Sequence, residues 1–287
     1  MPIDFSSVYY TYSPKTPLAY EALKGINLHI DSGEFVALVG RTGCGKSTLV
    51  SHINALLTPS KGEVRVDEFV SSPDKKRRSK KISPLRKKVG LVFQFPEYQL
   101  FEKTVLDDVA FGPKNFGKSK EEAIEDAKVA LSLVGMGERF YDRSPFELSG
   151  GEKRRAAIAG ILAIKPDYLV VDEPTAGLDP LGAKEMMDLF DEIHSKGTTL
   201  ILVTHDMSLV LKHCSRVIVM KQGQIARVCT PLELFKEDLS LYSLQIPPFY
   251  RFAKELRSKG LPIDLDKCLD LDCLAQEIIR AKGEGNG

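Results

Sequence analysis

A glycine-rich loop that ends in a lysine and a serine is the feature of this sequence best suited to chemistry. Residues 40–47 read Gly-Arg-Thr-Gly-Cys-Gly-Lys-Ser and match the pattern G-x-x-x-x-G-K-[ST]. In such a loop, backbone N–H groups converge on phosphate oxygens at the start of a helix, whose dipole favours negative charge. Lys46 would reach the terminal phosphates of a nucleotide, and the Ser47 hydroxyl would hold Mg²⁺. We therefore predict a nucleotide-binding loop made of Gly40, Arg41, Thr42, Gly43, Cys44, Gly45, Lys46, Ser47 and Thr48.

Two consecutive acids at the end of an apolar run supply the second half of this predicted site. Residues 168–173 read Tyr-Leu-Val-Val-Asp-Glu. A strand that ends in an acid would place Asp172 beside the metal ion. Glu173 follows directly, would point elsewhere, and could polarise an attacking water molecule. Such a run is common by itself, but together with the glycine-rich loop it predicts hydrolysis of the bound nucleotide.

Alternating strand-like and helix-like segments must position these groups. A helical pattern over 46–57 follows the glycine-rich loop, and further helical patterns cover 121–134 and 153–163. Strands alternating with helices predict an α/β fold with a mostly parallel sheet covered by helices. The block from about 96 to 160 has no strand-like run, so it is predicted to be an inserted helical subdomain. The predicted strands are 34–39, 89–93, 168–171, 200–203 and 217–220.

The composition excludes several classes of protein. The 40 basic and 39 acidic residues nearly cancel, so the overall charge indicates no nucleic-acid partner. No apolar run approaches the ~20 residues needed to cross a bilayer, so any membrane role is predicted to be peripheral. The five cysteines lack metal-ligand spacing and are expected to be reduced thiols. Cys44 lies at the start of a predicted helix, a setting that favours the reactive thiolate.

Two stretches outside the predicted site leave alternatives open. Residues 75–88 hold nine Lys or Arg and no acid, which fits a solvated loop or a phosphate-binding surface. Beyond Pro247-Pro248, apolar residues recur at helical spacing in two segments, at Phe249, Phe252, Ala253 and Leu256 and at Leu271, Leu274, Ala275 and Ile278. These stripes predict that residues 231–287 form a helical C-terminal extension that pairs two chains. The alternative is that the helices fold back onto their own chain.

A third glycine-containing motif completes a recognisable set. Residues 148–152 read Leu-Ser-Gly-Gly-Glu and open a predicted helix. With the two motifs above, residues 3–230 resemble the ATP-binding cassette (ABC) family. The resemblance implies a P-loop NTPase fold, with an ABC-type ATPase domain over 1–230, its helical subdomain at about 96–160, and an extension over 231–287. It also implies ATP and Mg²⁺ as cofactors, and contact of Ser149, Gly150 and Gly151 with ATP bound to a partner chain.

The same resemblance implies roles for single residues. Gln94 would sense Mg²⁺ and the γ-phosphate, Asp179 would couple the two composite sites, and His205 would contact the γ-phosphate. The implied catalytic residues are therefore Glu173, His205 and Gln94, and the implied metal ligands are Ser47, Gln94 and Asp172. For the aromatic that stacks on adenine, Tyr12 is the first candidate, with Tyr9, Tyr10 and Tyr20 as alternatives. Glu152 stands where the family usually has Gln, and we expect this change to be tolerated.

Further stretches indicate a particular branch of the family. Residues 93–101, 111–117 and 143–147 resemble the second type of ATPase subunit in energy-coupling factor (ECF) importers, which take up vitamins and other micronutrients. This resemblance implies a second ABC ATPase subunit, a paralogue or the same chain, a transmembrane coupling protein, and a substrate-binding membrane subunit. It implies a peripheral position on the cytoplasmic face of the cell membrane. The ATPase of another importer, for example one for metal ions, and a soluble regulatory ABC ATPase remain as alternatives.

The stretch after Gln94 predicts a docking surface. Phe95, Tyr98, Leu100 and Phe101 are unusually apolar for a loop, and acids at 97 and 102 add negative charge. Together they predict a groove that accepts an apolar helix carrying a basic residue. The alternative is that the aromatic side chains only pack the helical subdomain against the core.

Overall fold

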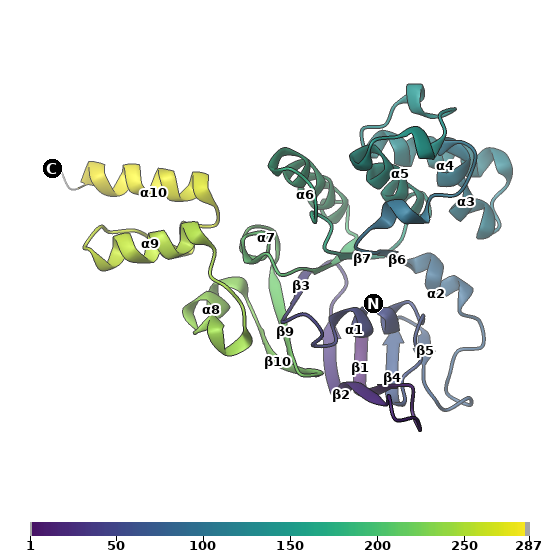
Figure 1. The fold of residues 1–287 in the computed structure, drawn as a ribbon, viewed down its shortest axis with the longest axis horizontal. Coiled ribbons are helices and arrows are strands. Elements are labelled where there is room, and N and C mark those ends of the chain that lie inside the picture. The colour runs from purple at the N-terminus through teal and green to yellow at the C-terminus, as the bar shows by residue number, and fades with distance from the viewer. Residues whose placement is uncertain (1, 285–287) are drawn as a thin grey trace.

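A six-stranded, mostly parallel sheet forms the centre of the computed structural model, which describes residues 2–284 (Figure 1). Every residue of β3 and β8 is buried, as expected for parallel strands with both faces covered by helices. Only the edge strand β10 runs antiparallel to its neighbour among the described strands of this sheet. In sheet order, the strands are β10 (Gln224–Cys229), β9 (Arg216–Lys221), β3 (Phe35–Val39), β8 (Thr199–Val203), β7 (Tyr168–Asp172) and β6 (Val89–Val92).

A second, antiparallel sheet of four strands lies beside the nucleotide loop and was not predicted from the sequence. In β2, the buried Ile26, Leu28 and Ile30 alternate with exposed residues, which is the period of a half-buried strand. This alternation is present in the sequence and could have revealed the strand. In sheet order, the strands are β2 (Tyr20–Ile30), β1 (Ile3–Tyr12), β4 (Lys61–Val66) and β5 (Phe69–Ser71).

Helices cover the parallel sheet and form the block between β6 and β7. Helix α1 ends at Ile53 rather than at residue 57, because Asn54 caps it and Ala55 takes a positive φ of 52° that breaks the helical path. The helices are α1 (Lys46–Ile53), α2 (Ser83–Lys88), α3 (Val105–Asn115), α4 (Lys120–Leu133), α5 (Gly150–Leu162), α6 (Pro180–Ser195), α7 (Met207–His213), α8 (Pro231–Lys236), α9 (Pro248–Ser258) and α10 (Leu271–Glu284).

Residues 96–160 hold α3, α4, most of α5 and short 3-10 turns, and no strand. These helices pack through small side chains, since Ala123 and Ala127 of α4 and Ala156 of α5 are fully buried in one apolar cluster. That cluster continues into the side chains of the parallel sheet. The helical block is therefore packed against the sheet that carries the predicted site.

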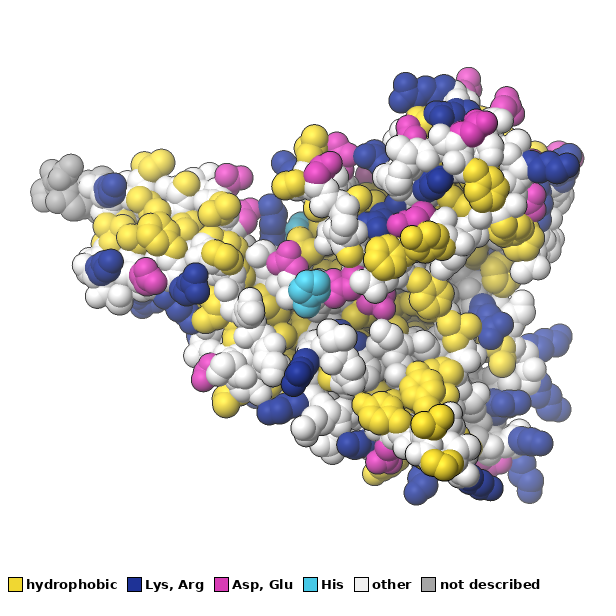
Figure 2. All heavy atoms as spheres, viewed as in Figure 1, with side chains coloured by type: hydrophobic (Ala, Val, Ile, Leu, Met, Phe, Trp, Pro, Cys, Tyr) yellow, Lys and Arg dark blue, Asp and Glu magenta, His cyan; other side chains and the backbone are white. Residues whose placement is uncertain are grey.

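The C-terminal helices project from the far edge of the parallel sheet (Figure 1). Helix α8 belongs to the sheet's core, since Leu234 and Phe235 are fully buried there. Helices α9 and α10 pack on each other through buried residues that include Ala253 and Leu274. Figure 2 shows hydrophobic side chains gathered on the surface of this pair. The exposed apolar residues Leu271, Ile279 and Phe252 define the outward face of α9 and α10. No helix within residues 2–284 is long and apolar enough to span a membrane.

Candidate nucleotide site

The glycine-rich loop joins β3 to α1, and its shape depends on glycine. Gly40 has a φ of +144°, and a Cβ there would lie 2.3 Å from the backbone oxygen of Met220. Gly45 has a φ of +109°, and a Cβ there would lie 2.7 Å from the backbone oxygen of Ala22. Both contacts are with backbone, which cannot move aside as a flexible side chain would. The loop therefore folds back over the end of β3, where the Lys46 Nζ donates to the Gly40 carbonyl at 2.7 Å.

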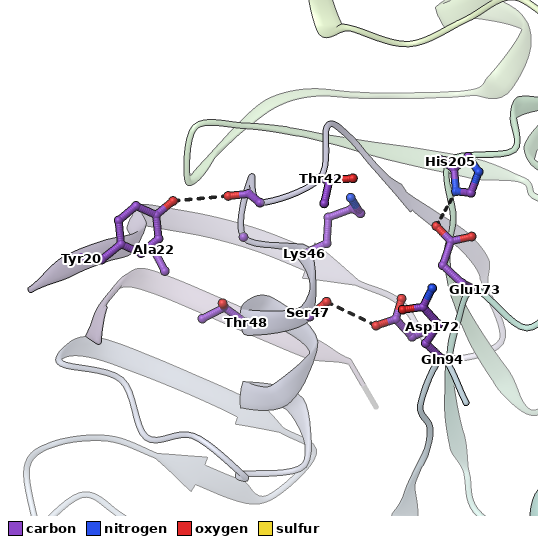
Figure 3. Close-up of a pocket in the computed structure, with 12 residues that line it drawn as sticks. Tyr20, Ala22, Thr42, Lys46, Ser47, Thr48, Gln94, Asp172, Glu173 and His205 are labelled. Atoms are coloured by element: carbon purple, nitrogen blue, oxygen red, sulfur yellow. Dashed lines mark hydrogen bonds and ion pairs between the residues drawn. The ribbon is translucent and has the colours of Figure 1, made fainter. Parts of the chain in front are cut away.

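A cavity of about 390 Å³ at the end of the parallel sheet collects most of the predicted site residues (Figure 3). This volume is in the range of small-molecule sites. The loop and α1 line one side, and the ends of β6, β7 and β8 bring polar side chains to the other. The lining residues are Tyr20, Ala22, Thr42, Gly43, Gly45, Lys46, Ser47, Thr48, Gln94, Asp172, Glu173 and His205. Ala22 was not predicted from the sequence, and no motif there points to it.

Oxygen atoms suited to Mg²⁺ meet on one wall of this cavity. The Ser47 hydroxyl donates to the Asp172 carboxylate at 3.3 Å, and the Gln94 side chain lies beside them (Figure 3). Burial raises the pKa of Asp172, and the hydrogen bond from Ser47 opposes that rise. Among residues 2–284, no group of three His, Cys, Asp or Glu could hold a metal alone. The donor set therefore fits Mg²⁺ carried by phosphate oxygens, with few protein ligands.

Glu173 is held in a strained position next to Asp172 (Figure 3). Its φ is 48°, which is uncommon for a residue other than glycine, and its backbone N–H donates to Val203 at 2.8 Å. One carboxylate oxygen lies 2.8 Å from His205 Nδ1, and the other accepts from the Thr204 hydroxyl at 3.3 Å. The structure thus brings the predicted base and the predicted γ-phosphate contact together, with Thr204 as an additional partner that the sequence did not single out.

Three residues of the predicted loop do not line this cavity. Arg41 and Cys44 instead line a neighbouring cavity of about 610 Å³, and Gly40 lies beneath the loop. The prediction of a reactive thiolate at Cys44 is wrong, because the residue is only 7 % exposed and burial raises the pKa of its thiol. The charge of Lys46 and backbone hydrogen bonds lower this pKa, but by less than burial raises it. We therefore expect Cys44 to contribute to phosphate binding through its backbone and not through its thiol.

Two tyrosines lie where an aromatic side chain could stack on adenine. Tyr20 lines the cavity, and its hydroxyl donates to the Gly43 carbonyl at 3.3 Å. Tyr12 lies outside the lining but is exposed beside it, with its hydroxyl 3.1 Å from that of Thr48 on α1. Tyr10 packs edge-on against both Tyr12 and the buried His52. Tyr9 does not line the cavity, and its ring centre lies 5.8 Å from Lys61 Nζ. Tyr12 and Tyr20 are therefore the candidates nearest the cavity.

The Ser149 motif lies away from the cavity at the start of α5. A Cβ at Gly150 or Gly151 would meet no atom of the chain within 4 Å, so this surface is open. Glu152 and Ser149 form a reciprocal capping box, in which each side chain accepts from the other's backbone N–H. A glutamate supports this helix end as well as the usual glutamine would. Asp179 is also exposed and caps α6 by accepting from Gly182 at 2.8 Å.

The aromatic side chains of the predicted docking stretch are exposed to solvent, whereas Glu97 is paired with a buried cation. Phe95, Tyr98 and Phe101 are exposed, whereas Leu100 is buried. A groove of about 190 Å³ there is lined by Glu97, Tyr98, Leu100, Pro145, Phe146 and Lys153. Glu97 is ion-paired inside the chain with Arg154, at 3.3 Å. Phe95 packs against Tyr98, and Phe101 packs against Phe111, with all four rings partly exposed.

Comparisons with known proteins agree with this fold and site. Residues 23–176 match the family model for ABC transporters. An energy-coupling factor transporter ATP-binding protein EcfA2 of Enterococcus faecalis is 51% identical, with 94% of this chain and 96% of the relative covered. The protein of that name in Streptococcus pneumoniae is 48% identical, with 93% and 98% covered. Among solved structures, cbiO1 of Clostridium perfringens, part of the ABC transporter complex cbiONQ, has a TM-score of 0.72 at 36% identity, with 90% of this chain and 95% of that chain covered. The dimeric ATP-binding cassette MJ0796 bound to ADP and Pi has a TM-score of 0.69 at 32% identity, with 80% and 98% covered.

The fold and the site together define an ATPase of the ABC transporter family. Within it, the chain belongs to the energy-coupling factor transporter ATP-binding proteins and is the ATP-hydrolysing subunit of an ECF importer. The alternatives of another importer's ATPase and of a soluble regulatory ATPase are not favoured, because the relatives that share about half of all residues carry the ECF name over most of the chain.

Proposed function

We propose that this chain hydrolyses ATP in composite sites formed with a second ABC ATPase subunit, and that this drives uptake of vitamins or other micronutrients. One observation carries the proposal: the cavity holds the phosphate loop and the acids, whereas Ser149, Gly150 and Gly151 face open space elsewhere on the same chain. Both observations are explained if the Ser149 motif of a second chain completes the nucleotide cavity of this one. The structural neighbour MJ0796, an ATP-binding cassette bound to ADP and Pi, is itself dimeric.

Within the cavity, each side chain has a distinct role. Lys46 and the backbone N–H groups of residues 42–48 bind the phosphates. Ser47, Asp172 and Gln94 would hold Mg²⁺, which when bound neutralises charge on the phosphate oxygens. Glu173 accepts a proton from, or orients, the attacking water, and its hydrogen bonds to His205 and Thr204 fix its direction. His205, which is exposed at the rim, contacts the γ-phosphate.

The outward face of α9 and α10 is the proposed contact that keeps two ATPase chains paired. Leu271 and Ile279 of α10 are 68% and 72% exposed, although they lie about 80° apart around the helix axis. The inward residues Leu274 and Ala281 are buried in the chain's own core. The helices thus satisfy their own packing and still present an apolar surface, which is typical of an interface. The partner ATPase is a paralogue or a second copy of this chain.

The groove beside Glu97 is the proposed docking site of a transmembrane coupling protein. Exposed aromatic side chains at 98 and 146 line it, and Phe95 packs against Tyr98, which suits an apolar helix. The coupling protein would in turn contact a separate substrate-binding membrane subunit. This arrangement places the chain peripherally on the cytoplasmic face of the cell membrane. The neighbour cbiO1 is itself described as part of a multi-subunit ABC transporter complex.

Replacing Glu173 with Gln tests the proposed chemistry. The assembled transporter with Glu173→Gln should bind ATP with unchanged affinity and lose at least about a hundredfold in turnover, because the base is removed and the phosphate contacts remain. Glu192→Gln is the matched control, since Glu192 is on the surface of α6 and pairs only with Lys196 among the recorded ion pairs of residues 2–284. More than a tenth of normal turnover in the Glu173 variant would show that another group is the base.

A further inference from the structure

Arg154 is a buried cation on α5 that bonds to two other segments. Its side chain is only 5% exposed. Two of its nitrogens donate to the Glu97 carboxylate, at 3.3 and 3.4 Å. A third donates to the backbone oxygens of Pro174 and Ala176, at 3.3 and 2.6 Å. A guanidinium is almost never buried without such partners, and its planar fork suits contacts in two directions at once.

The two carbonyls that Arg154 holds lie in the turn that directly follows Glu173. The Ala176 N–H donates back to the Glu173 carbonyl at 3.1 Å, so this turn and the strained Glu173 backbone form one hydrogen-bonded unit. The same turn leads on to Asp179 at the start of α6. A shift of the Arg154 guanidinium would therefore shift the backbone from which the Glu173 carboxylate is aimed.

The opposite end of the same ion pair faces the groove. Glu97 lies in the short 3-10 helix Pro96–Gln99, directly before the highly exposed Tyr98, and lines the groove of about 190 Å³. Its side chain is 17% exposed, so a cation in the groove can reach the carboxylate that Arg154 uses. Both bonds from Arg154 to Glu97, at 3.4 and 3.3 Å, are long for a charged pair, so a second cation at the groove can compete for the carboxylate.

We propose that Arg154 is a positioning residue. Through it, the orientation of the Glu173 carboxylate depends on what occupies the groove beside Glu97. A basic side chain of a docked helix competes for the Glu97 carboxylate, and the guanidinium then moves relative to the Pro174 and Ala176 carbonyls. Turnover is thereby sensitive to docking, with ATP binding left unchanged. This inference rests on the proposed docking function and adds the residues that carry the signal to the base.

The test uses the assembled transporter in vesicles and compares three single variants of this chain, together with the double variant Arg154→Lys/Glu97→Gln. Arg154→Lys keeps the charge but cannot reach Glu97 and two carbonyls together, and Glu97→Gln keeps the shape but loses the charge. Arg155→Met is the matched control, because the Arg155 side chain is partly exposed and pairs with Glu185 on the surface. For each variant, ATP affinity, kcat, KM and the ratio of turnover in the complex to turnover of the ATPase subunits alone are measured.

We expect Arg154→Lys to lower kcat about tenfold or more, with KM and ATP affinity changed less than twofold. Glu97→Gln should reduce the ratio of complexed to free turnover, and the double variant should lose less than the two single losses combined, because both act through one ion pair. Arg155→Met should match the wild type. A residue with a purely structural role would lower the amount of folded complex but leave kcat per folded molecule unchanged.

Two results would overturn the inference. One is a wild-type kcat in folded Arg154→Lys complex, and the other is additive losses in the double variant with an unchanged turnover ratio in Glu97→Gln. Glu173→Gln separates these outcomes from failure of the proposed chemistry. If that variant is inactive and Arg154→Lys has normal turnover, the base is correctly assigned and only the link through Arg154 is wrong. If Glu173→Gln stays active, the assignment of the base fails first.

Discussion

At the residue scale, the site combines positions that only one residue type can fill with positions that the sequence alone leaves open. Gly40 and Gly45 are required because any Cβ there would collide with backbone of another strand. The spacing of the loop predicted them, as it predicted Lys46 and Ser47. In contrast, the bonds of Arg154 to Glu97 and to the turn after Glu173 join segments far apart in the chain. No local pattern encodes such contacts, so only the fold reveals them.

Stacking on adenine is the residue-scale role that a binding measurement can assign. We expect Tyr12→Ala to weaken ATP binding about tenfold, because stacking on a base contributes about 1–3 kcal/mol. Tyr20→Ala is the comparison, since Tyr20 contacts the loop through its hydroxyl group. Titration of each full-length variant with a fluorescent ATP analogue gives the affinities. A larger loss for Tyr20→Ala than for Tyr12→Ala would transfer the role to Tyr20.

At the element scale, apolar runs predicted the buried parallel strands well, and the ends of helices less well. The runs at 34–39 and 200–203 differ from β3 and β8 by a single residue at one end. The antiparallel sheet was missed, although the alternation in β2 was visible, because its strands flank the conspicuous loop without a motif of their own. Helix α3 contains Pro113, which argues against a helix locally but is tolerated in the packed subdomain.

The ion pair between Lys212 of α7 and Asp270, just before α10, links the C-terminal helices to the rest of the chain, and its strength should depend on pH. The Asp270 carboxylate accepts from the Cys273 N–H at 2.8 Å and pairs with Lys212 of α7 at 2.8 Å. The Cys273 N–H first, and then Lys212, lower the pKa of Asp270 to about 2. Since the folded value lies below the ordinary value of about 3.9, this stabilisation is complete above about pH 4 and is lost as the pH falls towards 2.

We expect Asp270→Asn to lower the free energy of unfolding by about 1 kcal/mol at pH 7, a modest figure because Lys212 is partly exposed. The asparagine oxygen can still accept from Cys273, so the variant removes only the charge. The difference from the wild type should disappear between pH 4 and pH 2 in urea unfolding. Asp266→Asn, whose carboxylate lies 3.7 Å from Lys236 on the surface, is the control and should change little. A difference that persists at pH 2 would contradict this account.

At the scale of the whole molecule, one apolar cluster connects the helical block, the parallel sheet and the C-terminal helices. A movement of the helical block relative to the sheet is therefore transmitted through packed side chains. The nucleotide cavity lies at the end of the sheet, and the Ser149 motif lies at the start of α5 in the helical block. Helices α9 and α10 lie at the far edge of the sheet (Figure 1). The periodic stripes predicted the apolar face of these helices in the sequence, but they could not show which members turn inward. In the structure, Leu274 is buried whereas Leu271 is exposed.

The outward face of α9 and α10 gives the prediction that concerns the assembly. The double variant Leu271→Ser/Ile279→Ser should weaken pairing of the ATPase chains at least about tenfold, because two apolar side chains buried in an interface contribute roughly 1.5–3 kcal/mol each. ATP affinity should be unchanged, since neither residue lines the nucleotide cavity. Leu18→Ser is the control, because Leu18 is an equally exposed apolar residue away from these helices. Sedimentation without nucleotide, of the full-length chain alone and mixed with the second ATPase of its transporter, measures the pairing. Equal association of the double variant and the wild type in both samples would show that the chains pair through other surfaces.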